Sequence, residues 1–129
     1  MQPLRRHKTL LCIDDEANAL AGWCLYLQGA GYVVMGAASS AEGLQVFATT
    51  HIDAVILDYS MPDLNGDGVA ATMKKIKPEV PIVMFTGFSD LGSQVRAHVD
   101  VFVTKGCHPG ALLKTVDEVL GIVGDIAVA

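Results

Sequence analysis

Charged residues are scarce in this chain, and the basic ones are scarcer than the acidic ones. Only 18% of its 129 residues are charged, with 9 Lys and Arg against 14 Asp and Glu, which leaves a formal net charge of −5. Proteins that bind nucleic acid directly need clustered Lys and Arg for phosphate contacts. The charge balance therefore argues against direct nucleic-acid binding, and the 51% hydrophobic content argues against a disordered chain.

Long apolar runs are also absent. Stretches such as Ala54–Leu57 and residues 82–85 have only about four residues each, whereas a helix that spans a bilayer needs roughly 20. The basic start, residues 1–8, is followed by an apolar stretch that stops at Asp14, before the roughly 7 to 15 apolar residues of a signal peptide are reached. We therefore expect no membrane segment and a cytoplasmic location.

Cysteines are few, namely Cys12, Cys24 and Cys107. Their odd number and the lack of a C-x-x-C spacing argue against a disulfide framework and against a thiolate zinc site. Cys12 and Cys24 occupy apolar positions of the pattern, which predicts that both lie in the core.

What the chain does have is five short apolar runs, which we interpret as strands. They do not alternate with polar residues, and this is typical of strands buried on both faces of a parallel sheet between two helical layers. The runs cover residues 9–13, 32–37, 54–57, 82–85 and 101–103.

Segments with helical periodicity separate the runs. The first helix carries an apolar stripe and is expected to stop at Gly29 and Gly31. The second begins with a capping box formed by Ser39 and Glu42. The third ends before Pro78, because a proline disfavours helical geometry in the residue before it.

Two further helices complete the pattern. A weakly patterned one is expected over residues 89–97, and the last begins with Pro109 in its first turn and carries an apolar stripe to Val123. Five strand–helix units with right-handed crossovers place helices on both faces of an open sheet. The sequence thus predicts one domain over residues 1–129, a doubly wound α/β sandwich of three layers.

Acidic and hydroxyl residues stand where the strands end, which is the edge at which such sheets bind ligands. Asp14 and Asp15 follow the first run, and Asp58 follows the third. Thr86 and Lys105 stand at the ends of the fourth and fifth runs. Carboxylates that converge at one edge repel one another unless a cation neutralises them, and oxygen ligands favour Mg²⁺ or Mn²⁺ over zinc.

Each of these residues also has a simpler structural interpretation. An acidic residue before a helix often caps it, an aspartate after a strand often forms a turn, and Lys105 alone would be a solvated surface charge. Their joint placement at the ends of four different strands favours the interpretation as a site.

Together these motifs resemble the receiver domain of two-component response regulators, over about residues 9–123. The matching segments are Asp14-Asp15, residues 55–66 with Asp58 and Met61-Pro62, Phe85-Thr86-Gly87, and residues 102–105. The resemblance implies a flavodoxin-like (βα)5 fold with five parallel strands in the order 2-1-3-4-5.

The resemblance also implies a function. Asp58 is expected to accept a phosphoryl group from a sensor histidine kinase or a histidine phosphotransfer protein. Mg²⁺ would be held by Asp15, by Asp58 and by the backbone carbonyl of Ser60, with Asp14 reaching the ion through water. We therefore interpret the chain as a stand-alone phosphoacceptor and not as an enzyme that turns over a separate substrate.

The remaining motif residues are assigned to phosphoryl contacts and to switching. Lys105 and Thr86 would each contact a phosphoryl oxygen. As Thr86 moves toward that group, Phe102 would turn inward and change the face formed by the fourth helix, fifth strand and fifth helix. This face is where we expect a downstream protein target, or a second copy of the chain in a homodimer. Ordinary core packing is the other interpretation of Phe102.

Two other functions are considered, and one departure from the family bears on the first. The family usually places a proline after its lysine, often with a cis peptide, whereas Gly106 stands here; a trans peptide is expected, because a non-proline cis bond costs about 2.5 to 4 kcal/mol. Because of Gly106, a second interpretation stays open, in which the chain is a degenerate receiver that binds partners without phosphorylation. A phosphohydrolase of the haloacid-dehalogenase type also uses an aspartate and Mg²⁺, but Asp14-Asp15 lacks its Asp-x-Asp spacing.

Overall fold

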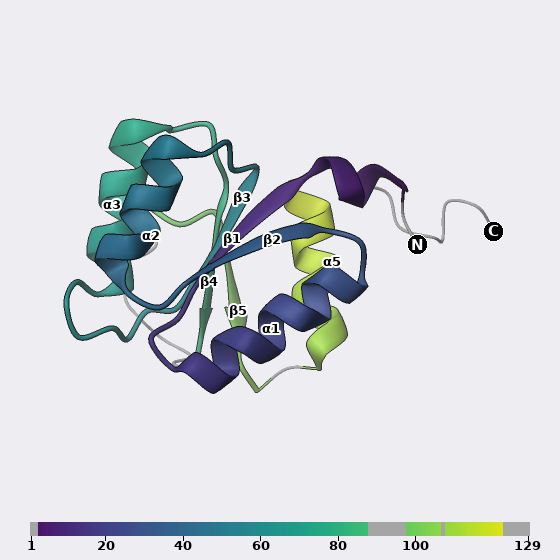
Figure 1. The fold of residues 1–129 in the computed structure, drawn as a ribbon, viewed down its shortest axis with the longest axis horizontal. Helices are drawn as coiled ribbons and strands as arrows, with labels where there is room; N and C mark the ends of the chain where they lie inside the picture. Colours follow the sequence, from purple (N-terminus) through teal and green to yellow (C-terminus); the bar gives the residue numbers. More distant parts are fainter. Residues whose placement is uncertain (1–2, 88–97, 107, 123–129) are drawn as a thin grey trace.

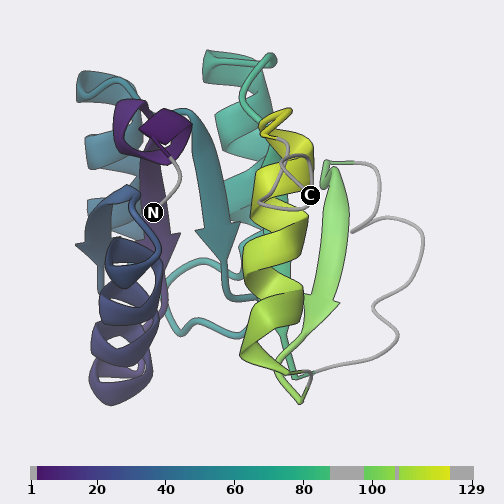
Figure 2. The same ribbon diagram turned by 90° about the vertical axis from the view of Figure 1, so that its right-hand side faces the viewer.

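Five parallel strands form one sheet in the order β2-β1-β3-β4-β5, as the resemblance implied. The computed structural model describes residues 3–87, 98–106 and 108–122. Figure 2 shows the strand arrows pointing the same way. The strands are β1 (Thr9–Ile13), β2 (Val33–Ala37), β3 (Ala54–Leu57), β4 (Ile82–Thr86) and β5 (Val101–Thr104). Three boundaries differ from the predicted ones by one residue, because Tyr32 precedes β2 while Thr86 and Thr104 end β4 and β5.

Helices cover both faces of this sheet and complete the predicted three-layer sandwich. In Figure 1, α2 and α3 lie on one side of the sheet, and α1 and α5 lie on the other. The described helices are α1 (Ala17–Gly29), α2 (Ser40–Thr49), α3 (Gly66–Ile76) and α5 (Pro109–Val119). The helix expected over residues 89–97 lies outside the described residues. Over the part of the chain that is described, no helix has the length and apolar character needed to cross a membrane.

The central strands are buried on both faces, which explains their unbroken apolar runs. Along β1, Leu11 and Ile13 pack with the α2 and α3 side chains, whereas Cys12 between them packs with those of α1 and α5. β2 and β5 lie at the edges of the sheet and are only partly buried; Val33 is 49% exposed. The two apolar layers hold the sheet rigidly between the helices, so the strand ends have fixed positions.

Three predicted helix boundaries are confirmed. α1 ends just before Gly31, whose φ of 116° lies in the left-handed region that favours glycine. α2 follows Ser39, whose hydroxyl accepts a hydrogen bond from the Glu42 N–H at 3.1 Å. α3 ends before Pro78.

The last helix is shorter than its apolar stripe predicted. We expected it to reach Val123, but α5 ends at Val119. Gly121 adopts a φ of 70°, and the Ile122 N–H donates to the Asp117 carbonyl at 2.8 Å, which closes the helix end as a Schellman-type turn. Ile122 is nevertheless buried after the turn, so the apolar stripe continues into the core without continuing the helix.

A buried ion pair, which the sequence pattern did not predict, fastens the N-terminal segment to α5. The segment forms a short 3₁₀ helix, η1 (Pro3–His7). The Arg5 guanidinium donates to both carboxylate oxygens of Asp117, at 3.0 and 2.6 Å, and to the Ala30 carbonyl at 3.1 Å. The Tyr32 hydroxyl donates to the same carboxylate at 2.5 Å. The planar two-point contact suits an arginine and satisfies the buried charge.

We predict that Asp117→Asn lowers the free energy of unfolding by about 3 to 5 kcal/mol, because it leaves the Arg5 charge buried without its partner. Urea denaturation followed by circular dichroism measures this. The double variant with Arg5→Met and Asp117→Leu should recover most of the loss, since it removes both charges together. A double variant as unstable as Asp117→Asn would contradict the explanation.

Candidate functional site

Two site residues, Asp58 and Lys105, each make a backbone hydrogen bond to the neighbouring strand just beyond the end of their own strand. These hydrogen bonds fix their backbone positions. The Asp58 N–H donates to the Ile13 carbonyl at 3.0 Å, and the Lys105 N–H donates to the Thr86 carbonyl at 2.8 Å. Because all strands run the same way, the residues that follow them lie along one edge. The structure therefore places Asp14, Asp58, Thr86 and Lys105 along one edge of the sheet. Their positions at the ends of the apolar runs predicted this.

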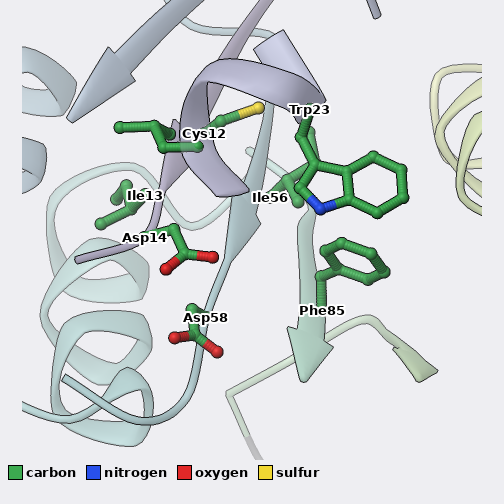
Figure 3. A pocket seen from close by; sticks show the side chains of 8 residues that line it. Cys12, Ile13, Asp14, Trp23, Ile56, Asp58 and Phe85 are labelled. Atoms are coloured by element: carbon green, nitrogen blue, oxygen red, sulfur yellow. The ribbon is translucent and has the colours of Figure 1, made fainter. Parts of the chain in front are cut away.

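Three carboxylates form a cluster at this edge. One carboxylate oxygen from each of Asp14, Asp15 and Asp58 lies within 4.8 Å of the other two. Two ligands on opposite sides of one Mg²⁺ lie about 4.2 Å apart, because each Mg–O bond is about 2.1 Å long. An all-oxygen cluster of this size fits Mg²⁺ or Mn²⁺ after small side-chain movements and lacks the nitrogen and sulfur ligands that zinc prefers. Figure 3 shows Asp14 and Asp58 next to each other in a small cleft.

The Lys105 ammonium lies between two of these carboxylates. Its Nζ is 2.8 Å from Asp14 Oδ2 and 3.4 Å from Asp58 Oδ1. The other Asp14 oxygen accepts the Glu16 N–H at 2.9 Å, which holds the Asp14 carboxylate in one orientation. Asp14 and Asp58 are buried, whereas Asp15 is exposed, so Lys105 offsets charge where solvent screens it least.

The pKa values of two site residues differ from their ordinary values. Burial raises the pKa of Asp58 above 3.8; the nearby Lys105 charge opposes this change and the Asp14 charge adds to it. For Lys105, burial alone would lower the pKa, but its hydrogen bond to Asp14 and the charge of Asp58 outweigh burial and raise it. The ammonium therefore stays protonated, and the cluster keeps an excess of negative charge that favours a cation.

The loop after Asp58 is held against α3 by a close backbone approach. A Cβ on Gly66, the first residue of α3, would lie 2.7 Å from the Tyr59 Cα and 2.8 Å from the Asp58 carbonyl oxygen. The Gly66 N–H donates to the Tyr59 carbonyl at 2.7 Å. Only glycine permits this approach, which holds the backbone at Asp58 in place.

A second contact anchors the same loop to α2. The Asp63 carboxylate accepts the N–H groups of Ser40 and Ala41 at 3.3 and 3.2 Å, at the first turn of α2. The Ser40 hydroxyl in turn donates to the Leu64 carbonyl. Ser60 lies exposed between Asp58 and these anchors, on a loop that is fixed at both ends.

An aromatic wall that sequence spacing did not reveal lines one side of the cleft. The Trp23 ring from α1 stands edge-on to the Phe85 ring from β4, with centroids 4.6 Å apart and planes at 90°. Both line the same cleft as Asp14 and Asp58 (Figure 3). Lys105 Nζ lies 5.9 Å from the Phe85 ring centre. Trp23 was predicted only as part of the apolar stripe of α1; its position at the site depends on the packing of α1 on β4.

The remaining predicted residues lie next to this group. Thr86 is almost fully buried at the end of β4. Phe102 is partly buried, pairs in register with Met84 and packs against the core on the α2 and α3 side. The peptide between Lys105 and Gly106 is trans, as expected, and no cis bond occurs among the described residues. The switching role of Thr86 and Phe102 stays a prediction.

Comparison with known families places the geometry in context. Residues 10–117 match the response regulator receiver domain family. A similar solved structure is the CheY-like response regulator receiver domain protein from Methanospirillum hungatei JF-1, with a TM-score of 0.83 and 28% identity, covering 88% of this chain and 94% of that one. The response regulator protein TrrA from Thermotoga maritima, solved in complex with Mg(2+)-BeF, gives a TM-score of 0.81 and 32% identity, covering 88% and 99%.

Similar curated proteins are longer than this chain. The transcriptional regulatory protein GlrR of Escherichia coli strain K12 is 33% identical over 114 residues, which cover 86% of this chain and 26% of the relative. The probable transcriptional regulator ycf27 of Cyanidium caldarium is 34% identical over 119 residues, which cover 90% and 47%. The chain thus spans between a quarter and a half of these relatives, and its organisation as one domain stays a prediction.

We predict that Asp58→Asn raises the free energy of unfolding by about 0.5 to 2 kcal/mol at neutral pH without divalent metal. The folded-state pKa of Asp58 is raised, so the stability that its neutral form contributes is complete below pH 3.8 and is lost as the pH rises through the raised value. The gain should therefore vanish near about pH 3, where the wild-type carboxyl is protonated as well. Chemical denaturation at both pH values measures it, and equal stabilities at neutral pH would contradict it.

We predict that Mg²⁺ changes the fluorescence of Trp23, the single tryptophan of the chain, in a saturable way, because its ring lines the cleft that contains Asp14 and Asp58. Asp15→Asn should raise the Mg²⁺ concentration at half-saturation by at least about tenfold, since it removes one carboxylate of the cluster. A Trp23→Phe variant serves as the blank, because it lacks the fluorophore. A response unchanged by Asp15→Asn would place the metal elsewhere.

Proposed function

Because this chain belongs to the response regulator receiver domain family, we propose that it accepts a phosphoryl group on Asp58 and passes that signal to a partner protein. The donor would be a phosphohistidine of a sensor histidine kinase or of a histidine phosphotransfer protein. The observation that carries the proposal is the buried Asp58 carboxylate beside two further carboxylates and one ammonium. A buried nucleophile with an adjacent cation site suits phosphoryl transfer.

In the proposed step, an Asp58 carboxylate oxygen forms a bond to phosphorus while the phosphorus–nitrogen bond to the donor imidazole breaks. The imidazole nitrogen keeps the electron pair and takes up a proton. Mg²⁺, when bound, offsets the negative charges of the carboxylates and of the phosphoryl oxygens. Asp14, Asp15, Asp58 and the Ser60 carbonyl would hold it, with Asp14 acting through water.

Lys105 and Thr86 would position the phosphoryl group. Lys105 already lies 3.4 Å from Asp58 Oδ1, so its ammonium can pair with a phosphoryl oxygen with little movement. In exchange it gives up part of its contact with Asp14, 2.8 Å away in this structure. The Thr86 hydroxyl would donate to a second oxygen. The raised pKa of Lys105 supports its role as a permanent cation.

The proposed signal leaves the site through β4 and β5. Thr86 pairs in register with Thr104, two residues after Phe102, so a shift of Thr86 toward the phosphoryl group acts on the strand that carries the aromatic ring. Phe102 is partly buried against the core, which leaves it room to exchange a partly exposed position for an inward one. The partner, a downstream protein or a second copy of this chain, would bind the face that includes β5 and α5.

Similarity to a kinase also supports the assignment to phosphoryl signalling. The autoinducer 1 sensor kinase/phosphatase LuxN of Vibrio campbellii is 31% identical over 81 residues, which cover 63% of this chain and 10% of that protein. Segments similar to this chain thus occur in a protein named as a sensor kinase/phosphatase and in the transcriptional regulatory protein GlrR.

We predict that incubation with Mg²⁺ and acetyl phosphate adds about 80 Da to the intact protein, because one phosphoryl group is attached. Asp58→Asn should abolish the addition, and Lys105→Ala should slow it by about 10² to 10³, since one charge that stabilises the transition state is lost. Glu79→Gln, at an exposed position beside the amino ends of the strands, is the matched control and should react at the wild-type rate.

Beryllofluoride provides a second measurement, since it mimics an aspartyl phosphate without covalent transfer. Mg²⁺ and beryllofluoride should together raise the thermal midpoint of the wild type and leave that of Asp58→Asn unchanged. If neither reagent modifies nor stabilises the wild type, the chain binds partners without phosphorylation and the proposed function is wrong. If the protein hydrolyses a generic phosphoester and this activity depends on Asp14, the chain is a phosphohydrolase instead.

A further inference from the structure

Two thiols that the proposed function does not use lie close together between β1 and α1. Cys12 lies on β1 and Cys24 on α1. Both belong to the apolar layer between the sheet and α1. Figure 3 shows the Cys12 sulfur pointing toward α1 and away from the Asp14 carboxylate.

A glycine on the neighbouring strand makes room for this contact. Gly36 of β2 pairs in register with Cys12. A Cβ on Gly36 would lie 3.2 Å from the Cys24 sulfur, which is tighter than an ordinary van der Waals contact. The Cys24 side chain therefore lies over Gly36, directly beside Cys12, and the packing around both keeps the two sulfurs close.

The two thiols differ in exposure in the way that a reacting and a resolving thiol do. Cys12 is only 2% exposed, whereas Cys24 is half-buried and within reach of a small reagent. The hydrogen bond from Cys12 lowers the pKa of Cys24 to about 7, so a large share of Cys24 is thiolate at neutral pH. The thiolate is the form that reacts with peroxides.

We propose that Cys12 and Cys24 form a redox modification site at which a hydroperoxide generates an intramolecular disulfide. The Cys24 thiolate attacks the terminal peroxide oxygen; the O–O bond breaks, Cys24 becomes a sulfenic acid, and the other oxygen leaves as hydroxide or alkoxide and takes up a proton from water. The Cys12 sulfur then attacks the Cys24 sulfur, and the sulfenic oxygen leaves as water with the Cys12 proton. Two thiols lose two electrons to one hydroperoxide.

The position of the pair gives the modification a consequence for the structure. The disulfide would join β1 to α1 and close the loop between them, which contains Asp14 and Asp15. Because the S–S bond is only about 2.05 Å long, its formation would draw α1 toward β1. Trp23, next to Cys24 in the chain, would move with the helix.

The test uses the full chain with Cys107→Ser, so that Cys12 and Cys24 are the only cysteines left. After treatment with about one equivalent of hydrogen peroxide, intact-mass spectrometry should show a monomer about 2 Da lighter. Peptide mapping should then link the two cysteines, and a thiol reductant should restore the mass. Cys24→Ser in the same background should show no such loss.

A second variant separates the two roles. Cys12→Ser removes the resolving thiol but keeps a hydrogen-bond donor beside Cys24, so the sulfenic acid on Cys24 should persist and its dimedone adduct should exceed that of the parent by at least about tenfold. Circular dichroism identifies any variant that fails to fold. Equal dimedone adduct in parent and Cys12→Ser, further oxidation without a 2 Da loss, or covalent dimers in place of the monomeric product would each overturn the proposal. None of these measurements depends on phosphorylation of Asp58.

Discussion

The structure is organised around the electrostatics of one sheet edge, where the Lys105 ammonium lies between the Asp14 and Asp58 carboxylates. One cation does not offset three carboxylates, and burial raises the pKa of Asp58 because the remaining charge is poorly solvated. The cluster therefore favours the binding of a further cation. In the proposed reaction, Lys105 would exchange a carboxylate oxygen for a phosphoryl oxygen.

Such a cluster costs stability and needs rigid support, which the neighbouring segments supply. Gly66 allows the backbone after Asp58 to lie directly on α3, and Asp63 binds the same loop to the first turn of α2. On the other side, Trp23 and Phe85 form a packed aromatic wall. Side chains held in this way can lie near their reactive positions before any ligand binds, which reduces the reorganisation that phosphoryl transfer requires.

Two other features link α5 to the N-terminal segment and α1 to β1. The ion pair between Arg5 and Asp117 fastens the N-terminal segment to α5, a helix of the face that we propose for partner binding. The neighbouring thiols of Cys12 and Cys24 lie between α1 and the strand that leads into the acidic loop. Through the ion pair, the N-terminal segment stabilises the helix that would read out the signal. Through the thiols, oxidation would act on the segments that flank the acidic cluster.

The apolar runs and their spacing determined the architecture, because strands buried on both faces and helices with one apolar stripe leave few arrangements open. Residues that directly follow the strands, such as Asp14, Asp58 and Lys105, could be assigned to one edge for the same reason. Other features depend on the tertiary structure. Trp23 lines the cleft, Arg5 pairs with Asp117 and the two thiols lie close together only because the helices pack on the sheet at particular positions. The residues that are brought together in this way have separations in the chain that follow no period.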